Sequence, residues 1–315
     1  MRGPGRIPER RSGRLASQPV SEPEVSVVLA IAGDAASMVS VFAALQQGCG
    51  DVSAELIVVT AGAARYEGLS LSPFTKTRVE YCSAGTLTPV LWGTGLRLAR
   101  GQVVAFTTEQ MRVDRGWARA LRDAVLAGAS GAGGPIALGA GTSLATTAAY
   151  FLRYSAFSSD AWPTQGPAHD VAGDNAAYDR QATMRHADLV KEGFWEMEFH
   201  RRFERDGLHL KMIPAARATL VGPLFLATMF GQRFSHGREF GSTRVLRHGA
   251  SRAKIVLSAP LVPLVLLLRI GRRVLRMSNN RMRFLWSLPG LTILAVAWAA
   301  GEAAGALQRG PRSAD

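Results

Sequence analysis

Two carboxylates, Glu196 and Glu198, stand in the first turn of a helix that the sequence predicts to end near Gly207. The positive end of a helix dipole stabilises charged carboxylates there, so we expect both groups to be ionised and able to accept a proton from a substrate. Residues two apart do not share a helix face. One carboxylate can therefore point into a cleft while the other braces the helix.

Each of these acids also has a basic residue four positions later. Arg202 is the expected ion-pair partner of Glu198, and His200 that of Glu196. The competing interpretation is therefore two helix-start acids engaged only in surface ion pairs, which are common and contribute little.

The segment Gly173-Asp174-Asn175 precedes this helix and has the composition of a turn. It leads into a short predicted helix at 176–178. Asp174 and Asn175 would lie beside Glu196 and orient a bound sugar, or they cap the short helix with no role in binding.

Several segments occur in a characteristic order along the chain. They are Val25–Leu29, Leu56–Val59, Ala99–Phe106, Gly116-Trp117, Gly133-Gly134-Pro135 and the stretch Gly173–Gly207. In this order, over residues 25–222, the chain resembles the nucleotide-sugar-dependent glycosyltransferases of the GT-A fold, the large inverting group called family 2. The resemblance implies a Rossmann-like α/β domain with a mostly parallel sheet at 24–222.

The resemblance also implies roles for individual residues. The family's general base aligns with Glu196, a further acid of that motif with Glu198, and Trp195 precedes them. The base would deprotonate an acceptor hydroxyl as it attacks the sugar of a nucleotide-sugar donor. The remaining donor- and substrate-binding positions would be Asp34, Gly62, Thr107, Thr108, Glu109 and Gln110, together with Asp174 and Asn175.

The family's metal-binding Asp-x-Asp motif aligns with Thr108-Glu109-Gln110, where neither aspartate is present. Hard cations such as Mg²⁺ or Mn²⁺ prefer several oxygen ligands. Three interpretations stay open: a metal-independent enzyme in which arginines neutralise the diphosphate, a divalent cation held by Glu109 with His236, or a degenerate, non-catalytic relative. Arg233 and Arg238 are the arginines expected to bind the diphosphate, on a predicted loop at 234–241.

Charge is distributed unevenly in this chain of 315 residues, whose formal net charge is +13. Residues 1–14 contribute +4 and residues 233–315 contribute +11, so the part between them is close to neutral at −2. A basic nucleic-acid module is thereby excluded for the central domain. Arginines interleaved with apolar runs at the C-terminal end favour an anionic membrane surface as partner.

Hydrophobic periodicity predicts the order of the elements. Near-continuous apolar runs are typical of buried parallel strands, and strands alternating with helices indicate an α/β fold. We expect strands at 25–32, 55–59, 78–81, 102–106 and 136–138, and helices at 36–47, 89–100, 117–127 and 222–233. Residues 1–23 are expected to form a disordered basic tail with no signal peptide. Cys49 and Cys82 show no metal or redox spacing.

The C-terminal region, 223–315, is predicted to form a membrane-associated hydrophobic helical hairpin. Ile255–Leu268 is too short to cross a bilayer comfortably and is expected to lie in the interface or re-enter it, whereas Phe284–Leu307 is long enough to span. The sequence thus predicts an inverting glycosyltransferase at the cytoplasmic face of the cell membrane, with a lipid-linked or envelope-polysaccharide acceptor. The alternative is a non-catalytic sugar-nucleotide-binding or scaffolding protein.

Overall fold

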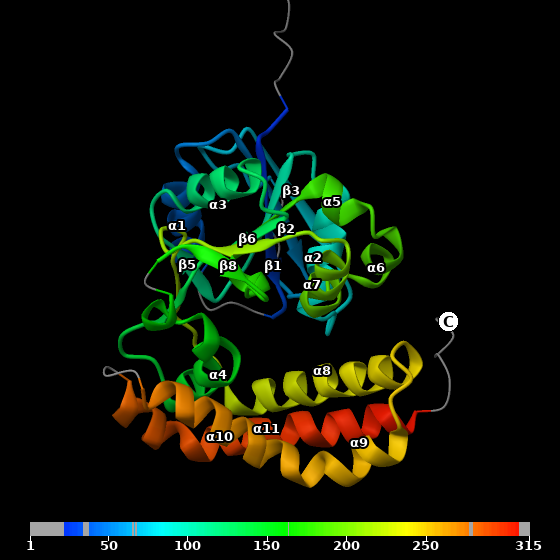
Figure 1. Ribbon diagram of the computed structural model, residues 1–315. Helices are drawn as coiled ribbons and strands as arrows, with labels where there is room; N and C mark the ends of the chain where they lie inside the picture. Colours follow the sequence, from blue (N-terminus) through cyan, green and yellow to red (C-terminus); the bar gives the residue numbers. More distant parts are fainter. Residues whose placement is uncertain are drawn as a thin grey trace, which may run out of the picture.

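The computed structural model describes residues 22–33, 38–64, 66, 68–162, 164–276 and 280–308. Its centre is an eight-stranded, mostly parallel sheet that lies above a layer of C-terminal helices (Figure 1). Across the sheet the order is β3 (Lys76–Tyr81), β2 (Ala54–Thr60), β1 (Val25–Ile31), β4 (Val103–Thr108), β9 (Ala176–Asp179), β6 (Gly131–Gly133), β10 (Leu210–Met212) and β8 (Gly166–Ala168). The α/β prediction is therefore confirmed.

Helices cover both faces of this sheet. One face is packed by α1 (Val39–Cys49) and α3 (Trp117–Leu126), and the other by α2 (Thr88–Leu98), α6 (Ala187–Glu192) and α7 (Glu196–Arg205). The central strands β1, β2 and β4 are buried on both sides, and every residue of Val25–Ile31 is buried. A sheet covered in this way requires the continuous apolar runs seen in the sequence.

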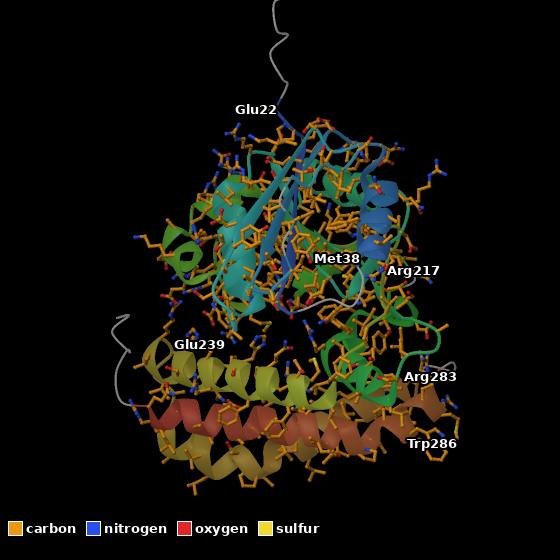
Figure 2. All side chains as sticks on the ribbon, turned by 180° about the vertical axis from the view of Figure 1, so that it is seen from behind. Glu22, Met38, Arg217, Glu239, Arg283 and Trp286 are labelled. Carbon is orange, nitrogen blue, oxygen red and sulfur yellow. The ribbon has the colours of Figure 1, made fainter. Side chains whose placement is uncertain are left out.

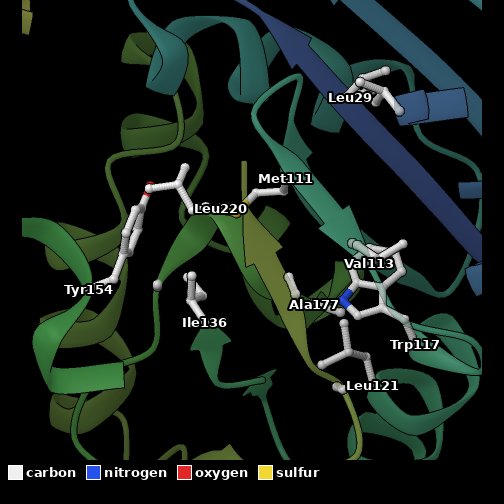
Figure 3. Close-up of a cluster of buried hydrophobic side chains, with 14 of the residues drawn as sticks. Leu29, Met111, Val113, Trp117, Leu121, Ile136, Tyr154, Ala177 and Leu220 are labelled. Carbon is white, nitrogen blue, oxygen red and sulfur yellow. The ribbon is translucent and has the colours of Figure 1, made fainter. Parts of the chain in front are cut away.

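A second, three-stranded sheet joins β5 (Met111–Val113), β11 (Ala218–Leu220) and β7 (Ile136–Leu138). Figure 3 shows its side chains Met111, Ile136 and Leu220 in the buried cluster that also contains Trp117 and Tyr154. The same cluster continues into α4 (Leu144–Tyr154) and to buried residues of the C-terminal helices. The α/β part and the helical layer thus share one core.

The short helix expected at 176–178 is wrong. These residues belong to β9, which runs antiparallel between β4 and β6 in the middle of the sheet. A Cβ at Gly131 on β6 would lie 2.6 Å from the Tyr178 ring, so the glycine at this position makes room for the tyrosine. A helix, α5 (Arg180–Met184), begins directly after β9. The Asp179 carboxylate caps it by accepting a 2.6 Å hydrogen bond from the Ala182 amide.

The helical layer contains α8 (Leu226–Leu246), α9 (Arg252–Ser258), α10 (Val262–Val274) and α11 (Arg281–Leu307). Two stretches, Arg252–Val274 and Arg281–Leu307, are long and apolar enough to cross a membrane. The prediction of a loop at 234–241 is wrong, because these residues lie in the middle of the continuous helix α8.

The glycines that indicated a loop serve instead to bring two helices together. Gly237 and Gly241 on α8 face α11, where Gly301 and Gly305 repeat the same four-residue spacing. A Cβ at Gly241 would lie 2.1 Å from the Glu302 carbonyl oxygen, and one at Gly305 would lie 1.8 Å from the Arg238 carbonyl oxygen. Such small-xxx-small pairs permit direct backbone contact between helices.

We expect Gly305→Ala to destabilise the protein by about 1–3 kcal/mol, since the added methyl group has no space between the two backbones. The control is Gly231→Ala on α8, where an added Cβ meets nothing within 4 Å and the higher helix propensity of alanine favours folding. Thermal unfolding in detergent measures both. An unchanged melting temperature for Gly305→Ala would contradict the close packing of α8 on α11.

Candidate active site

A cavity of about 290 Å³ lies between the α/β domain and the helical layer. The α/β side contributes residues from the start of α2, the end of α4, the 173–175 turn and the start of α7, and the opposite wall comes from α8 and Trp298 of α11. Figure 2 shows Glu239 on the side of α8 that faces the α/β domain. The site is thus built from both halves of the fold.

Glu196 lines this cavity, held by the backbone of the preceding turn. Its Oε2 accepts a 3.1 Å hydrogen bond from the Gly173 amide. A Cβ at position 173 would lie 2.3 Å from that oxygen, so only glycine leaves room for the carboxylate. The Gly173 and Glu196 motifs of the sequence therefore meet in space.

Burial raises the pKa of Glu196 to about 8, and the neighbouring carboxylates Asp174 and Asp170 add to the rise. Arg153 and the Gly173 amide oppose it. The expectation that the helix dipole keeps this acid ionised is therefore wrong, since desolvation outweighs the dipole. A carboxylate whose pKa lies near the working pH is well suited to accept a proton.

Asp174 is buried beside Glu196 and forms an ion pair with Arg153. The Arg153 Nη2 lies 3.0 Å and 2.9 Å from the two carboxylate oxygens. Arg153 comes from the last turn of α4, so the pair joins two distant segments of the chain. With Asp174 engaged in this way, Glu196 is the carboxylate of this group that can take up a proton from a ligand.

The opposite wall presents nitrogen groups and aromatic rings. The Arg233 guanidinium lies 4.4 Å from the centroid of the Trp298 ring, and the His236 ring stands edge-on to Trp195 at 5.9 Å. Burial, with Arg233 and Arg153 nearby, lowers the pKa of His236 to about 3, so this imidazole is neutral. His236 can donate or accept one hydrogen bond in the cavity but carries no charge.

The donor-side residues gather at the carboxyl ends of the parallel strands, where ligands bind in such sheets. Thr108 pairs with Ala30, and Thr60 with Ile31, at the same edge. The hydroxyls of Thr107 and Thr108 are buried and have no hydrogen-bond partner within the described ranges. Both residues are buried beneath this edge, and neither lines the cavity.

Glu109 follows these threonines and is a buried carboxylate. It accepts a 3.3 Å hydrogen bond from the Ala32 amide. Burial raises its pKa to about 7, with smaller effects of Asp174 and Arg153. The same ion pair also affects the pKa of Glu196, so both acids lie within its electrostatic influence.

Other predicted residues are placed differently. Asn175 is fully buried and structural: its side chain accepts a 2.6 Å hydrogen bond from the Trp117 indole and donates to the Pro135 and Ala216 carbonyls. Gly62 donates a 3.1 Å hydrogen bond to the Thr60 hydroxyl at the donor edge. Asp34 lies outside the described residues. The cavity lining includes none of the following predicted site residues: Gly62, Thr107, Thr108, Glu109, Gln110, Asn175 and Arg238.

The expected partners of the two helix-start acids are also wrong. Glu198 pairs with Arg201 at 2.7 Å, one turn on, and Arg202 reaches Asp188 at 2.8 Å instead. His200 is turned into the core, where it binds Asp170 and the Tyr178 hydroxyl. Glu198 still lines the cavity, so it braces α7 at the edge of the site.

Sequence reasoning missed the residues that complete the cavity from elsewhere in the chain. Arg153 and Trp298 belong to no motif, and only the folded chain brings them to Glu196. Trp92 connects the two halves of the site, because it lines the cavity and its indole donates a 3.1 Å hydrogen bond to the Thr107 carbonyl.

The residues at the end of β4 are a poor set of ligands for a divalent cation. Among the described residues of Thr107–Gln110, Glu109 is the one carboxylate, and hard cations prefer several oxygen ligands. No cluster of three or more His, Cys, Asp or Glu side chains in the described ranges is arranged to hold a metal ion. We therefore assign no step of the chemistry to a metal.

The chain matches none of the models of protein families, and a search of the curated proteins finds no match.

The raised pKa of Glu196 has a consequence for stability. The ordinary pKa of the Glu196 carboxyl is 4.5, and in the folded protein it is about 8. Between these two pH values the folded protein holds a proton that the unfolded chain has released. The contribution of Glu196 to the free energy of unfolding therefore falls as pH rises through this range.

Glu196→Gln removes the ionisable group but keeps size and polarity. We expect the variant to gain stability relative to the wild type from pH 5 to pH 8, measured by denaturant unfolding at each pH. Parallel stability curves for the two proteins would show that Glu196 titrates as an ordinary surface acid.

Proposed function

We propose that this protein is an inverting glycosyltransferase of the GT-A type, which transfers a sugar from a nucleotide-sugar donor to a lipid-linked or envelope-glycan acceptor. The observation that carries the proposal is Glu196, a cavity carboxylate with a pKa of about 8, placed by the Gly173 amide beside the buried ion pair of Asp174 and Arg153. The motif order in the sequence supports the same activity, and the mostly parallel sheet is compatible with it.

In this mechanism the donor binds at the carboxyl ends of β1, β2 and β4, the edge at which ligands bind in such sheets. The acceptor enters the cavity, and its hydroxyl oxygen attacks the anomeric carbon from the face opposite the nucleotide. The bond to the nucleotide diphosphate breaks as the new glycosidic bond forms. Glu196, in its ionised form, takes the proton of the attacking hydroxyl.

Charge stabilisation is the second requirement, because the leaving diphosphate gains negative charge. The guanidinium of Arg153 lies in the same cavity, and arginine is a bidentate donor to phosphate oxygens. A binding or scaffolding protein of the same fold is the competing function. The acid with a pKa near neutrality favours the enzyme, because such groups cluster at catalytic sites.

The helical layer supports work at a membrane surface. Large apolar side chains on α9 to α11 are exposed: Leu257, Leu261, Leu264, Val265 and Leu268, and Met282, Leu285, Trp286, Ile293 and Val296. Arginines accompany them on α10 and at the start of α11. Apolar residues combined with arginines are typical of helices that lie in the interface of an anionic bilayer.

We propose that these helices lie flat rather than cross the bilayer. Figures 1 and 2 both show α8 and α11 running lengthwise beneath the α/β domain, with α9 farthest from it. If α11 were to span the bilayer, its neighbour, the polar α/β domain, would be placed alongside hydrocarbon. Phe284–Leu307 is long enough to cross a bilayer, as the sequence predicted, and the proposal is that it lies in the interface instead.

We expect Glu196→Gln to lower the rate of sugar transfer by about 10²–10⁴-fold, the usual effect of losing a positioned general base, with donor affinity retained. The matched control, Glu198→Gln, removes a carboxylate from the same turn that is engaged by Arg201, and should reduce the rate by less than about tenfold. Transfer is measured with a panel of nucleotide sugars, with and without Mn²⁺ and EDTA. Full turnover in Glu196→Gln would disprove its role, and a wild type that binds donor without any turnover would favour the non-catalytic protein.

The pH dependence of the reaction gives an independent check. For the wild type, kcat/KM should rise with pH up to about 8 and then level off, as Glu196 loses its proton. The residual activity of Glu196→Gln should lack this rise. The same rise in both proteins would assign the titration to another group.

The orientation of α11 is tested by single cysteines at its two ends, Met282→Cys and Gln308→Cys, in a Cys82→Ser background. Sealed membrane vesicles of known orientation are treated with a membrane-impermeant maleimide, and detergent-opened vesicles give the total labelling. A flat helix exposes both positions to the same side of the membrane. Labelling of the two ends from opposite sides would show that α11 spans the bilayer.

A further inference from the structure

Arg233 is a partly buried cation whose Nε is inaccessible to solvent, and the described residues supply it with no acidic partner. Within the described residues it forms no ion pair, and its Nε has no hydrogen-bond partner. The other basic residues of the cavity are engaged: Arg153 by Asp174, and Arg247 by Glu192. An unpaired charge removed from water is costly. An anion from outside the chain would compensate the charge of Arg233.

The surroundings of Arg233 add to this positive character. Burial and the nearby Arg153 lower the pKa of Arg233 to about 9, which still leaves it charged at neutral pH. The acid closest along the same helix, Glu239, is exposed at the cavity edge. An anionic group that enters the cavity would therefore meet Arg233 with no carboxylate between them on α8.

Part of the cavity lining is apolar and aromatic, beside the charged groups already described. Trp298 lies under the guanidinium, and Phe240, Met197, Leu152 and Phe157 line the same cavity. Most of these groups suit a hydrocarbon chain rather than the hydroxyls of a free sugar. The ligand that fits combines one anionic head group with an apolar chain.

The helices that carry this wall also carry the exposed apolar face. Trp298 is on α11, and so are Trp286 and Ile293, which are 68% and 43% exposed. A membrane lipid that enters along α11 would bring its head group to the cavity while its chain stays near the apolar face.

We infer that Arg233 and Trp298 form a binding site for the phosphate group of a lipid-borne acceptor. This inference rests on the proposed function for the identity of the acceptor, but it concerns a different wall of the cavity from Glu196. The nucleotide diphosphate has the same phosphate chemistry, so the test must separate the two sources.

Binding of a C15 isoprenyl monophosphate to the full-length protein in detergent is measured by calorimetry, with the C15 alcohol, inorganic phosphate and a nucleoside diphosphate as comparison ligands. The wild type should bind the isoprenyl phosphate at least tenfold more tightly than the alcohol. Arg233→Gln should weaken phosphate binding by about 10- to 100-fold, the usual effect of losing a charged hydrogen bond, and leave nucleotide binding unchanged. Arg233→Lys should restore part of the affinity.

Two controls make the result specific. Arg115→Gln changes the net charge equally at an exposed residue outside the cavity and should bind as the wild type does. Arg233→Gln should also melt no lower than the wild type, because it removes an unpaired, partly buried charge, whereas a structural arginine would cost stability.

Unchanged isoprenyl phosphate binding in Arg233→Gln, or loss of nucleotide binding instead, would overturn the inference. A wild type that prefers the alcohol would do the same. Glu196→Gln should bind the isoprenyl phosphate as tightly as the wild type does. A wild type that binds the isoprenyl phosphate but transfers no sugar would contradict the proposed function without contradicting the lipid-phosphate site.

Discussion

Arg153 reaches from the end of α4 to Asp174 in the turn before β9, and this ion pair lies among the ionisable groups of the cavity. It affects the pKa of Glu109 on the donor side and of Glu196 on the acceptor side. It also adds to the depression of the pKa of His236 on the opposite wall. One buried pair thus connects the sheet edge, the first turn of α7 and the helical layer electrostatically, and breaking a buried pair is strongly destabilising.

The strands of the first half of the fold could be predicted because their pattern is local. A run such as Val25–Ile31, apolar and β-branched, has few other ways to bury itself. By contrast, Ala176–Asp179 carries no strand signal of its own. It becomes a strand because β4 and β6 leave a place between them, and such tertiary effects override local propensity.

The glycines of α8 show a second limit of sequence reasoning. Gly237 and Gly241 read as a loop because glycine is a poor helix former. In the folded chain the same property lets the backbones of α8 and α11 touch, so the reason for each glycine lies on another helix more than fifty residues away.

The candidate site was predictable on one side only. Glu196 follows from its place in a helix, and Gly173 meets it as the motif order implies. The environment of Glu196 could not be predicted from the sequence, because burial and neighbours distant in the chain set its pKa. The cavity wall formed by Arg233, His236 and Trp298 depends on how α8 and α11 dock, which no local pattern encodes.

The helical layer that closes the cavity also separates it from the apolar face. Packed helices lie about 8–10 Å apart. The cavity wall comes from α8 and from Trp298 of α11, and exposed apolar side chains lie on α9, α10 and α11, so the thickness of the helical layer stands between that face and the cavity. Under the proposed function, this layer would act on a bilayer as a spacer that sets the height of Glu196 above the lipid surface. It would select acceptors by how far their reactive hydroxyl projects from the membrane, a length criterion independent of the identity of the sugar.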